Sequence, residues 1–393
     1  MKLTFPPNFI FGTSTAAYQI ETAVDHDWQG HKSKDGYVFE RTSDHELRFA
    51  EDAAIIAYCG GMYRMSLQWS KLQRAPFAEF EKAVVNEYRN FLDDLKARGV
   101  KIMMVLHHFT NPKWFAAKGG WERSENITMW VDFCKKTEQE FGDYVTYWNT
   151  FNEPNVYVSN GWVLGEFPPY KNNLLKAFTV IANLGKAHHI VYDYLKEKRR
   201  DQPIGISHNC VAFTAENWLG VLPAKISDWW FMDYTLAKFA DKLDFFGLSY
   251  YARISHDPLP ITYLDTPEKF AKYNKPHDGM WEYYPQGMKE SIERYWKKYK
   301  LPVFITESGI CANDDKQRVA AMKDYVKIIH DCLASGIPML GYLWWSTFDN
   351  FEWNLGPTFR FGLYETDLTT KDRIKRPSAD VFHHLAYNKE IEV

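Results

Sequence analysis

Eight short apolar runs alternate with amphipathic stretches along most of this 393-residue chain. Polar, glycine or proline residues close each run, which is typical of a buried strand leaving its sheet. Strand-helix alternation of this kind favours parallel strands. The strands are expected at residues 9–15, 62–67, 101–107, 145–151, 203–208, 245–249, 303–306 and 340–345.

The stretches between the strands carry apolar residues at helical spacing. They predict helices at residues 44–58, 81–98, 126–141, 174–198, 224–240, 286–299 and 317–335, with a closing helix near 378–388. Eight strands, each followed by a helix, is the count of a (β/α)8 barrel. No linker or repeat interrupts the pattern. We therefore expect an α/β fold in which residues 1–393 form a single (β/α)8 TIM barrel domain, with its functional site at the C-terminal ends of the strands.

Charge and cysteine content restrict the partners and the compartment. Lys and Arg total 47 against 50 Asp and Glu, so the charge does not favour nucleic acid or an anionic membrane. The five cysteines are scattered, which indicates neither a disulfide framework nor a zinc site. There is no signal-peptide pattern and no apolar run of membrane-spanning length. We expect a cytoplasmic protein with no membrane contact.

Two glutamates stand at the ends of predicted strands. Glu153 lies between Asn152 and Pro154, and Glu307 follows the strand expected at 303–306. Because a barrel brings the C-terminal ends of its strands to one face, the two carboxyl groups should meet there. A facing pair of carboxyl groups is what hydrolysis of a glycosidic bond requires.

The residues around the two glutamates suggest different roles for them. Glu153 is the better acid, because Pro154 turns the chain directly after it. Glu307 is the better nucleophile, because Arg64 and a tyrosine on the sixth strand could keep it ionised. A separation of about 5 Å would imply a covalent intermediate and retention, and a wider gap inversion. The sequence leaves that separation open.

Aromatic and histidine residues add weaker signals. Aromatic residues make up 17% of the chain. Most belong in a core, but those at predicted strand ends have flat faces that could stack on sugar rings. The aromatic residues in question are Trp121, Trp344, Trp345 and Trp353. His107 and His108 are adjacent on a strand and point to opposite faces, so they cannot easily share a metal ion. We expect no catalytic metal.

Six ordered stretches of the chain resemble glycoside hydrolase family 1, the β-glucosidase family. They span residues 9–21, 63–69, 106–109, 150–154, 304–309 and 345–353, and a further match follows at 360–362. The resemblance implies a retaining β-glycosidase that needs no cofactor and acts on small β-glycosides or short oligosaccharides. β-Glucosidase is the first expectation, with a range that could include galactose, fucose, mannose and xylose. The substrate would be a terminal non-reducing β-D-glycosyl residue, cleaved through a covalent glycosyl-enzyme intermediate.

The resemblance also assigns roles by position. It implies Glu153 as acid/base and Glu307 as nucleophile, with Arg64 and Tyr251 supporting the nucleophile. Trp345 would form a floor under the sugar. The implied sugar-binding residues are Gln19, His108, Asn152, Tyr251, Trp345, Glu352, Trp353 and Phe361. A carboxylate at position 352 suits neutral hydroxyl groups and would repel a 6-phosphate.

Several positions depart from the family pattern. Ser249 and Ser308 stand where the family usually has Asn. Asn155 occupies a position often filled by a large apolar residue that faces the leaving group, so we expect a hydrophilic aglycone. The chain is short between Trp229 and Asp244, which predicts a more open or reshaped aglycone side. Two alternatives stay open: a transglycosylase, and an inactive sugar-binding protein on the same fold.

Overall fold

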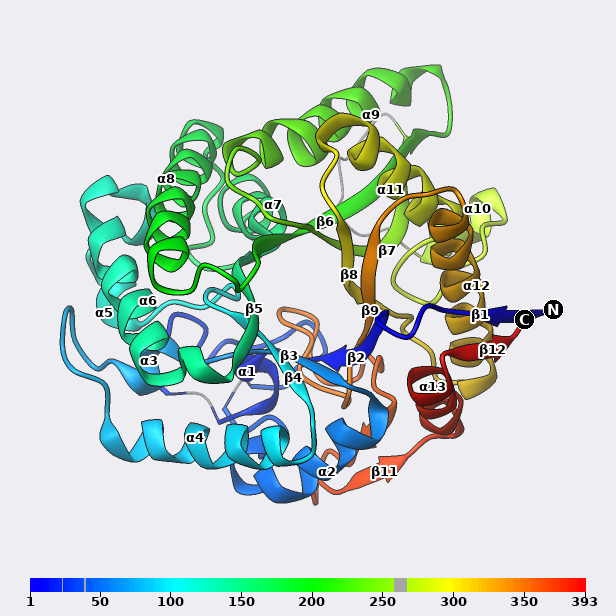
Figure 1. Cartoon of the computed structure of the whole chain (residues 1–393). Helices are drawn as coiled ribbons and strands as arrows, with labels where there is room; N and C mark the ends of the chain where they lie inside the picture. The colour runs from blue at the N-terminus through cyan, green and yellow to red at the C-terminus, as the bar shows by residue number, and fades with distance from the viewer. Residues whose placement is uncertain (23, 39, 258–266) are drawn as a thin grey trace.

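The computed structural model describes residues 1–22, 24–38, 40–257 and 267–393. Eight parallel strands close into a barrel, in which each strand pairs with the next and the last pairs with the first (Figure 1). The strands are β2 (Ile10–Ser14), β3 (Met62–Ser66), β4 (Lys101–Val105), β5 (Val145–Asn152), β6 (Ile204–Ala215), β7 (Phe246–His256), β8 (Val303–Ser308) and β9 (Met339–Trp345). The expected (β/α)8 barrel is confirmed.

Helices surround the barrel, as Figure 1 shows. The long ones are α2 (Phe49–Cys59), α4 (Lys82–Ala97), α6 (Ile127–Phe141), α8 (Leu174–Lys198), α11 (Gln286–Tyr299), α12 (Asp315–Ala334) and α13 (Pro377–Asn388). They agree with expectation to within about two residues at each end, except that α2 begins at Phe49, after the turn η1 (His45–Leu47), where the helix was expected from 44.

The helix expected at 224–240 is wrong as a continuous element. The chain forms α9 (Val221–Asp228), a π-helical turn η7 (Trp229–Tyr234) and a 3₁₀ turn η8 (Leu236–Lys238). The carbonyl of Phe231 accepts hydrogen bonds from the Asn155 amide at 3.2 Å and the Thr235 hydroxyl at 2.8 Å. Two side chains therefore donate to a carbonyl oxygen that would accept a backbone N–H in an unbroken helix.

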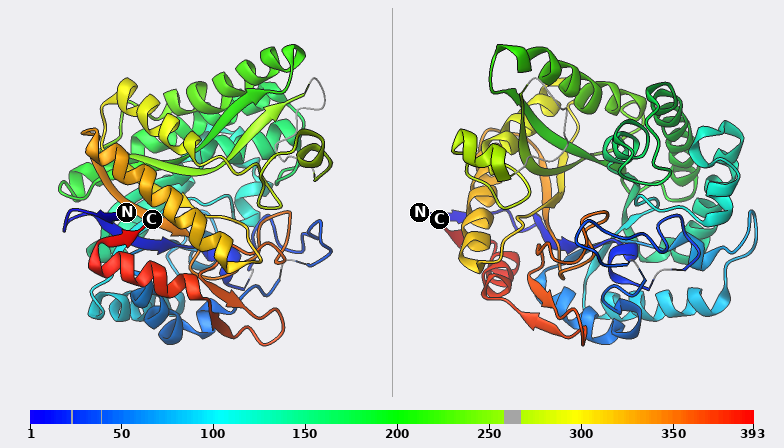
Figure 2. Two further views of the ribbon diagram at one scale, coloured as in Figure 1. Left: turned by 90° about the vertical axis from the view of Figure 1, so that its right-hand side faces the viewer. Right: turned by 180° about the vertical axis from the view of Figure 1, so that it is seen from behind.

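Shorter elements complete the chain. The helices among them are α1 (Ala17–Ile20), α3 (Trp69–Leu72), α5 (Lys113–Ala117), α7 (Pro154–Val158) and α10 (Pro267–Tyr273), with the turns η1 (His45–Leu47), η2 (Gly120–Glu122), η3 (Ser124–Asn126), η4 (Gly142–Tyr144), η5 (Ser159–Leu164) and η6 (Trp218–Gly220). Two antiparallel strand pairs lie outside the barrel: β10 (Tyr364–Thr366) with β11 (Arg373–Lys375), and β1 (Lys2–Thr4) with β12 (Glu390–Glu392). The second pair brings the termini side by side (Figure 2).

The barrel interior changes from apolar to polar along the strand direction. A cluster of Met62, Met103, Phe245, Phe304 and Leu343 fills its lower part. Side chains two residues further along a strand lie on the same face. Arg64, Thr306 and Trp345 therefore follow Met62, Phe304 and Leu343 into the upper part of the barrel. The alternation places polar groups above an apolar floor, at the end where a barrel holds its functional site.

Register shifts near the strand ends aim two important side chains inward. In β5, Thr150 contacts His188 of α8 at 2.8 Å and Phe151 stacks on Trp130 of α6, so two successive residues face outward. A register shift against β6 lies between Asn149 and Asn152, and Asn152 faces the interior.

Strand β8 shows the same effect. Thr306 faces the interior, where it accepts a hydrogen bond from Ser207 at 2.7 Å. Strict alternation would turn Glu307 outward, but the register shifts against both neighbouring strands at this point. Bulges of this kind redirect side chains next to active sites.

Strands β6 and β7 continue together well beyond the level where the other strands end. Their register runs on from Val211 opposite Ala252 to Ala215 opposite His256. Helix α9 packs against this extension on the outside (Figure 1). No helix within the described residues is long and apolar enough to cross a membrane.

Candidate active site

Glu307 lies at the end of β8 and is almost fully buried. Its carboxylate pairs with the Arg64 guanidinium through Oε1 and accepts a hydrogen bond from the Tyr251 hydroxyl at 3.0 Å through Oε2. Burial raises the pKa of Glu307, while Arg64 and Tyr251 act in the opposite direction and favour the ionised form.

Glu153 follows β5 and occupies the N-cap position of α7, which begins at Pro154, where the sequence predicted only a turn. Its backbone is left-handed, with φ of 40°, and its N–H donates to the Ser207 carbonyl at 2.7 Å. Its Oε1 accepts a hydrogen bond from the Asn209 amide at 2.8 Å. Burial, and next the negative charge of Glu307, raise the pKa of Glu153 to about 8. Near neutral pH this carboxyl group therefore holds a proton.

Arg64 connects three strands at the centre of the barrel. It is fully buried, and its Nη2 donates to Asn152 Oδ1 at 2.6 Å and to Ser207 Oγ at 3.0 Å. The Asn152 amide nitrogen lies 2.9 Å from His108 Nε2. Since an amide NH₂ can only donate, this nitrogen of His108 accepts and the ring is neutral. Burial and the charge of Arg64 lower the pKa of His108, in agreement with a neutral ring.

Aromatic rings form one wall of the site. The ring of Trp353 lies nearly parallel to that of His108, with centroids 5.7 Å apart, and Trp345 lies 6.1 Å from His108. The peptide bond between Trp345 and Ser346 is cis. The rings of Trp345 and Trp353 thus both lie close to His108, which contacts Asn152.

Gln19 and Glu352 meet at the edge of this wall. The Gln19 amide donates to Glu352 Oε2 at 3.3 Å and to Asn350 Oδ1 at 3.1 Å. Burial, and next the charge of Glu307, raise the pKa of Glu352 to about 8. Glu352 is only partly buried, and the charge of Glu307 acts on it across the site.

A second aromatic group lies on the other side of Glu307. The Tyr251 ring packs edge-on against Phe361 at 6.0 Å, and Trp281 lies 5.4 Å from Tyr251 and 6.2 Å from Phe361. The residues that the family resemblance assigned to catalysis and sugar binding are thus linked by contacts or electrostatic effects to this region of the barrel.

Sequence reasoning missed Asn209, Ser207 and Trp281. Ser207 lies near the end of the strand expected at 203–208 and belongs to the apolar-to-polar change inside the barrel, and Asn209 directly follows that strand. The run of three polar residues over 207–209 was the available signal for the positions of the first two. Trp281 precedes α11 in an irregular segment, where no periodic pattern marks it.

Three expectations from the sequence are corrected. Asn155 has no exposed surface, and its amide donates to the Asn209 carbonyl at 2.8 Å, so it joins α7 to β6 and does not face a leaving group. Trp344 points away from the site because it precedes the inward-facing Trp345 on the same strand. Trp121 is buried against Trp130 of α6.

Of the serines at the two family positions, Ser249 lies in the site, whereas Ser308 lies on the outer side of β8, where it acts on the pKa of Tyr325 of α12 and of Tyr342. Ser249 stands opposite Glu307 in the register of β7 and β8 and is fully buried, as is Ser308. Ser249 also acts against the rise in the pKa of Glu153. Ser249 therefore lies beside both carboxyl groups. Within the described residues no group of His, Cys, Asp or Glu is arranged to hold a metal ion.

A model of glycosyl hydrolase family 1 matches residues 1–216 and 225–391. The chain belongs to glycosyl hydrolase family 1. This member of the family is a glycoside hydrolase. It is 26% identical to β-glucosidase A of Thermotoga maritima over 99% of both chains. It is 29% identical to a β-galactosidase of Saccharolobus solfataricus, over 79% of this chain and 71% of the relative. The solved β-glycosidase of Pyrococcus horikoshii superposes with a TM-score of 0.87 at 30% identity, covering 100% of this chain and 97% of the other.

Proposed function

We propose that this family 1 enzyme is a retaining β-glycosidase in which Glu307 is the nucleophile and Glu153 the acid/base. The observation that supports this is the unequal surroundings of the two buried carboxyl groups. Glu307 contacts Arg64, which favours its ionised form, while the pKa of Glu153 is raised to about 8. Pairs of carboxyl groups whose pKa values are driven apart mark an acid and a base.

The reaction then proceeds in two displacements. Glu307 attacks the anomeric carbon while Glu153 gives its proton to the glycosidic oxygen, and the aglycone leaves. Glu153, now ionised, takes a proton from water, and the water displaces Glu307 with net retention. The Tyr251 hydrogen bond to Oε2 holds the nucleophile in one orientation during both steps.

We propose that the sugar lies over Trp345. Its hydroxyl groups far from the reacting carbon would contact Gln19, Glu352 and Trp353. His108 and Asn152 would lie nearer the reacting carbon, and Phe361 would line the site. Glu352 offers a carboxyl group that can donate or accept a hydrogen bond, because its pKa is raised to about 8. A 6-phosphate would add negative charge to a site that already holds the ionised Glu307, so neutral glycosides are preferred. Glucose and galactose are the first glycones to test, since the relatives include a β-glucosidase and a β-galactosidase.

The proposal is tested with nitrophenyl glycosides of both anomers and several sugars. Wild type should turn over β-linked substrates only, and Glu307→Ala should lose turnover while keeping the fold. The matched control is Glu125→Ala, which removes an exposed glutamate in η3 and should change nothing. Near-normal turnover by Glu307→Ala would refute the nucleophile assignment.

Stereochemistry and products distinguish the remaining alternatives. NMR of the first-formed sugar should show the β anomer, and the α anomer would indicate inversion. Added alcohols that raise transfer product above hydrolysis would indicate a transglycosylase. Sugar binding without turnover in the folded wild type would indicate a binding protein.

We also propose that residues 1–393 act as one catalytic domain, since barrel strands run from Ile10 to Trp345 and the terminal strands pair with each other. A cytoplasmic location is supported by the five cysteines, all of which are unpaired thiols. Limited proteolysis tests the domain proposal: a stable, separately folding fragment would contradict it.

A further inference from the structure

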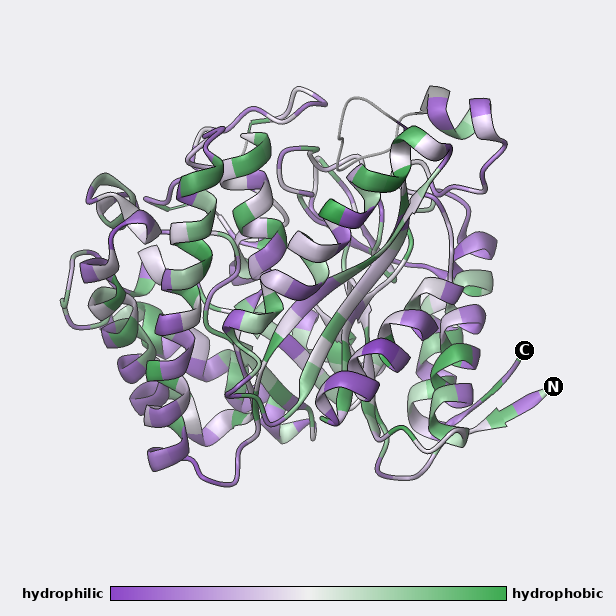
Figure 3. Ribbon diagram, turned by 90° about the horizontal axis from the view of Figure 1, so that it is seen from above, coloured by the Kyte–Doolittle hydropathy of each residue, from purple (hydrophilic) through white to green (hydrophobic). Residues whose placement is uncertain are grey.

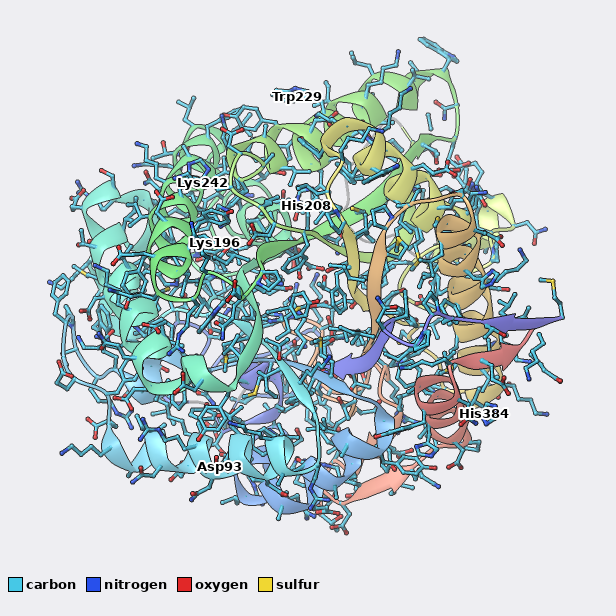
Figure 4. The ribbon with its side chains drawn as sticks, viewed as in Figure 1. Asp93, Lys196, His208, Trp229, Lys242 and His384 are labelled. Carbon is cyan, nitrogen blue, oxygen red and sulfur yellow. The ribbon has the colours of Figure 1, made fainter. Side chains whose placement is uncertain are left out.

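An exposed apolar surface covers the outer side of α9 and the turns at its ends. We call it the α9 face. Six of the seventeen exposed large apolar side chains of the described residues lie in this short stretch, with Trp218 80% and Leu222 65% exposed. They are Trp218, Leu219, Val221, Leu222, Ile226 and Trp229. Figure 3 shows hydrophobic residues along this outer helix, and Figure 4 places Trp229 at the outer edge of the molecule.

The inner side of the same segment is apolar as well. Ala224, Phe231 and Met232 are buried against the molecule. Gly220 lies so close to β7 that a Cβ there would be 2.0 Å from the His256 carbonyl oxygen. Because only glycine fits at position 220, this side of the segment must face β7. The exposed apolar side chains therefore cannot turn inward. Apolar residues on both the inner and the outer side of a helix indicate that much of its outer side is covered in the functional state.

The size of the α9 face fits a subunit interface. From the exposed fractions, the six side chains present on the order of 700 Å² of surface, above the largest apolar patch of most monomers. A standard interface buries about 800 Å² on each partner, of which a little more than half is apolar. The α9 face alone therefore supplies the apolar area that a stable dimer needs. Its two exposed tryptophans are of the type that dominates binding energy at interfaces.

The charges near the face disfavour a lipid surface as its occupant. Helices that lie on membranes are rich in Lys and Arg on their polar side. The charged residues of α9 are Lys225 and Asp228, and Asp228 pairs with Arg294 at 2.7 Å. The whole chain carries a net charge of −3. An anionic membrane would gain little from this surface.

Part of the α9 face, including Trp218 and Leu222, lies in residues 217–224, outside the two ranges that the family model matches. We infer that the α9 face is the contact between two copies of this chain, which meet about a twofold axis with the same residues on each side. Closed twofold dimers are the commonest soluble assemblies, and they require one self-complementary patch of this kind.

Sedimentation velocity over a wide range of protein concentrations tests the inference. Wild type should sediment as a dimer of the 46.2 kDa chain, and Leu222→Asp should sediment as a monomer over the same range. Removing a central apolar contact and burying a charge should raise the dimer dissociation constant at least about 100-fold. The control is Leu47→Asp, which introduces the same charge at a 74% exposed leucine outside the face and should remain dimeric.

Ile226→Lys provides a second variant of opposite charge and should also be monomeric. Unchanged melting temperature and unchanged hydrolysis in the variants would show that folding and the active site are intact. A wild type that stays monomeric at every concentration, or a Leu222→Asp variant that stays dimeric, would overturn the inference. Monomeric wild type that co-sediments with phosphatidylcholine vesicles, with Leu222→Asp unable to do so, would overturn it in favour of a lipid surface.

Discussion

The Arg64 guanidinium gives the two catalytic carboxyl groups their different behaviour. Glu307 forms an ion pair with it, while Glu153 has an amide, Asn209, as its hydrogen-bond donor. A cation in contact stabilises a carboxylate more than a neutral donor does. The first proton is therefore lost from Glu307, and its charge in turn keeps Glu153 protonated.

Asn209 is expected to set the alkaline limit of activity. Its N–H donates to Glu153 and stabilises the ionised form, so Asn209→Ala should raise the pKa of Glu153. The alkaline limb of the kcat/KM profile should move up by about one pH unit. Its acid limb, which reports Glu307, should stay in place. Asn388→Ala, at an exposed position near the C-terminus, serves as the control; an alkaline limb that does not move would show that Asn209 does not act through Glu153.

At the level of the elements, the spacing between β8 and β9 holds the nucleophile beside the sugar floor. Gly309 follows β8, and a Cβ there would be 2.0 Å from the Trp345 carbonyl oxygen. That contact cannot be relieved by a flexible side chain, because the neighbour is backbone. The two strand ends would have to separate, which would move Glu307 away from Trp345.

Gly309→Ala should therefore lower kcat/KM on the order of 100-fold, since small displacements of reacting groups have effects of this size. Gly61→Ala is the matched control, because a Cβ at Gly61 meets no atom within 4 Å. The measurement is steady-state hydrolysis at the optimal pH. Equal activity of the two variants would mean that the strand spacing is not under constraint at this point.

For the molecule as a whole, the active site lowers stability at neutral and alkaline pH. The pKa of Glu153 is about 8 in the folded state, above its ordinary value of 4.5. Between these pH values the unfolded chain loses this proton and the folded chain keeps it, so the free energy of unfolding falls as pH rises through this range. Above pH 8 the full cost of burying the charge is present.

Glu153→Gln removes this titration and should therefore be more stable than wild type at pH 8, with a smaller difference near pH 4.5. Scanning calorimetry at the two pH values gives the melting temperatures. This gain in stability should be accompanied by a loss of activity, because active sites often sacrifice stability for function. A stability difference between variant and wild type that is the same at both pH values would contradict the linkage.

Much of the candidate site could be predicted from short motifs. Glu153 and Glu307 stand next to Pro and Gly at the ends of apolar runs, and the strand-helix alternation alone was sufficient to bring those ends together. The polar run over 207–209 marks the position of Asn209, but the inward direction of its side chain was not predictable, because it depends on how β6 pairs with β5 and β7. The register shifts in β5 and β8 were equally hidden, since one extra residue changes which side of a strand is inside.

The sequence by itself determined the barrel and its chemistry, because apolar periodicity and turn residues are local signals that act within a few positions. Only the tertiary structure decided the direction of Asn155, the break after α9 and the electrostatic difference between the two glutamates. Each of these depends on a partner distant in the chain: the Asn209 carbonyl for Asn155, the Asn155 amide for Phe231, and Arg64 for Glu307. Such contacts form only when the barrel closes, and no local pattern encodes them.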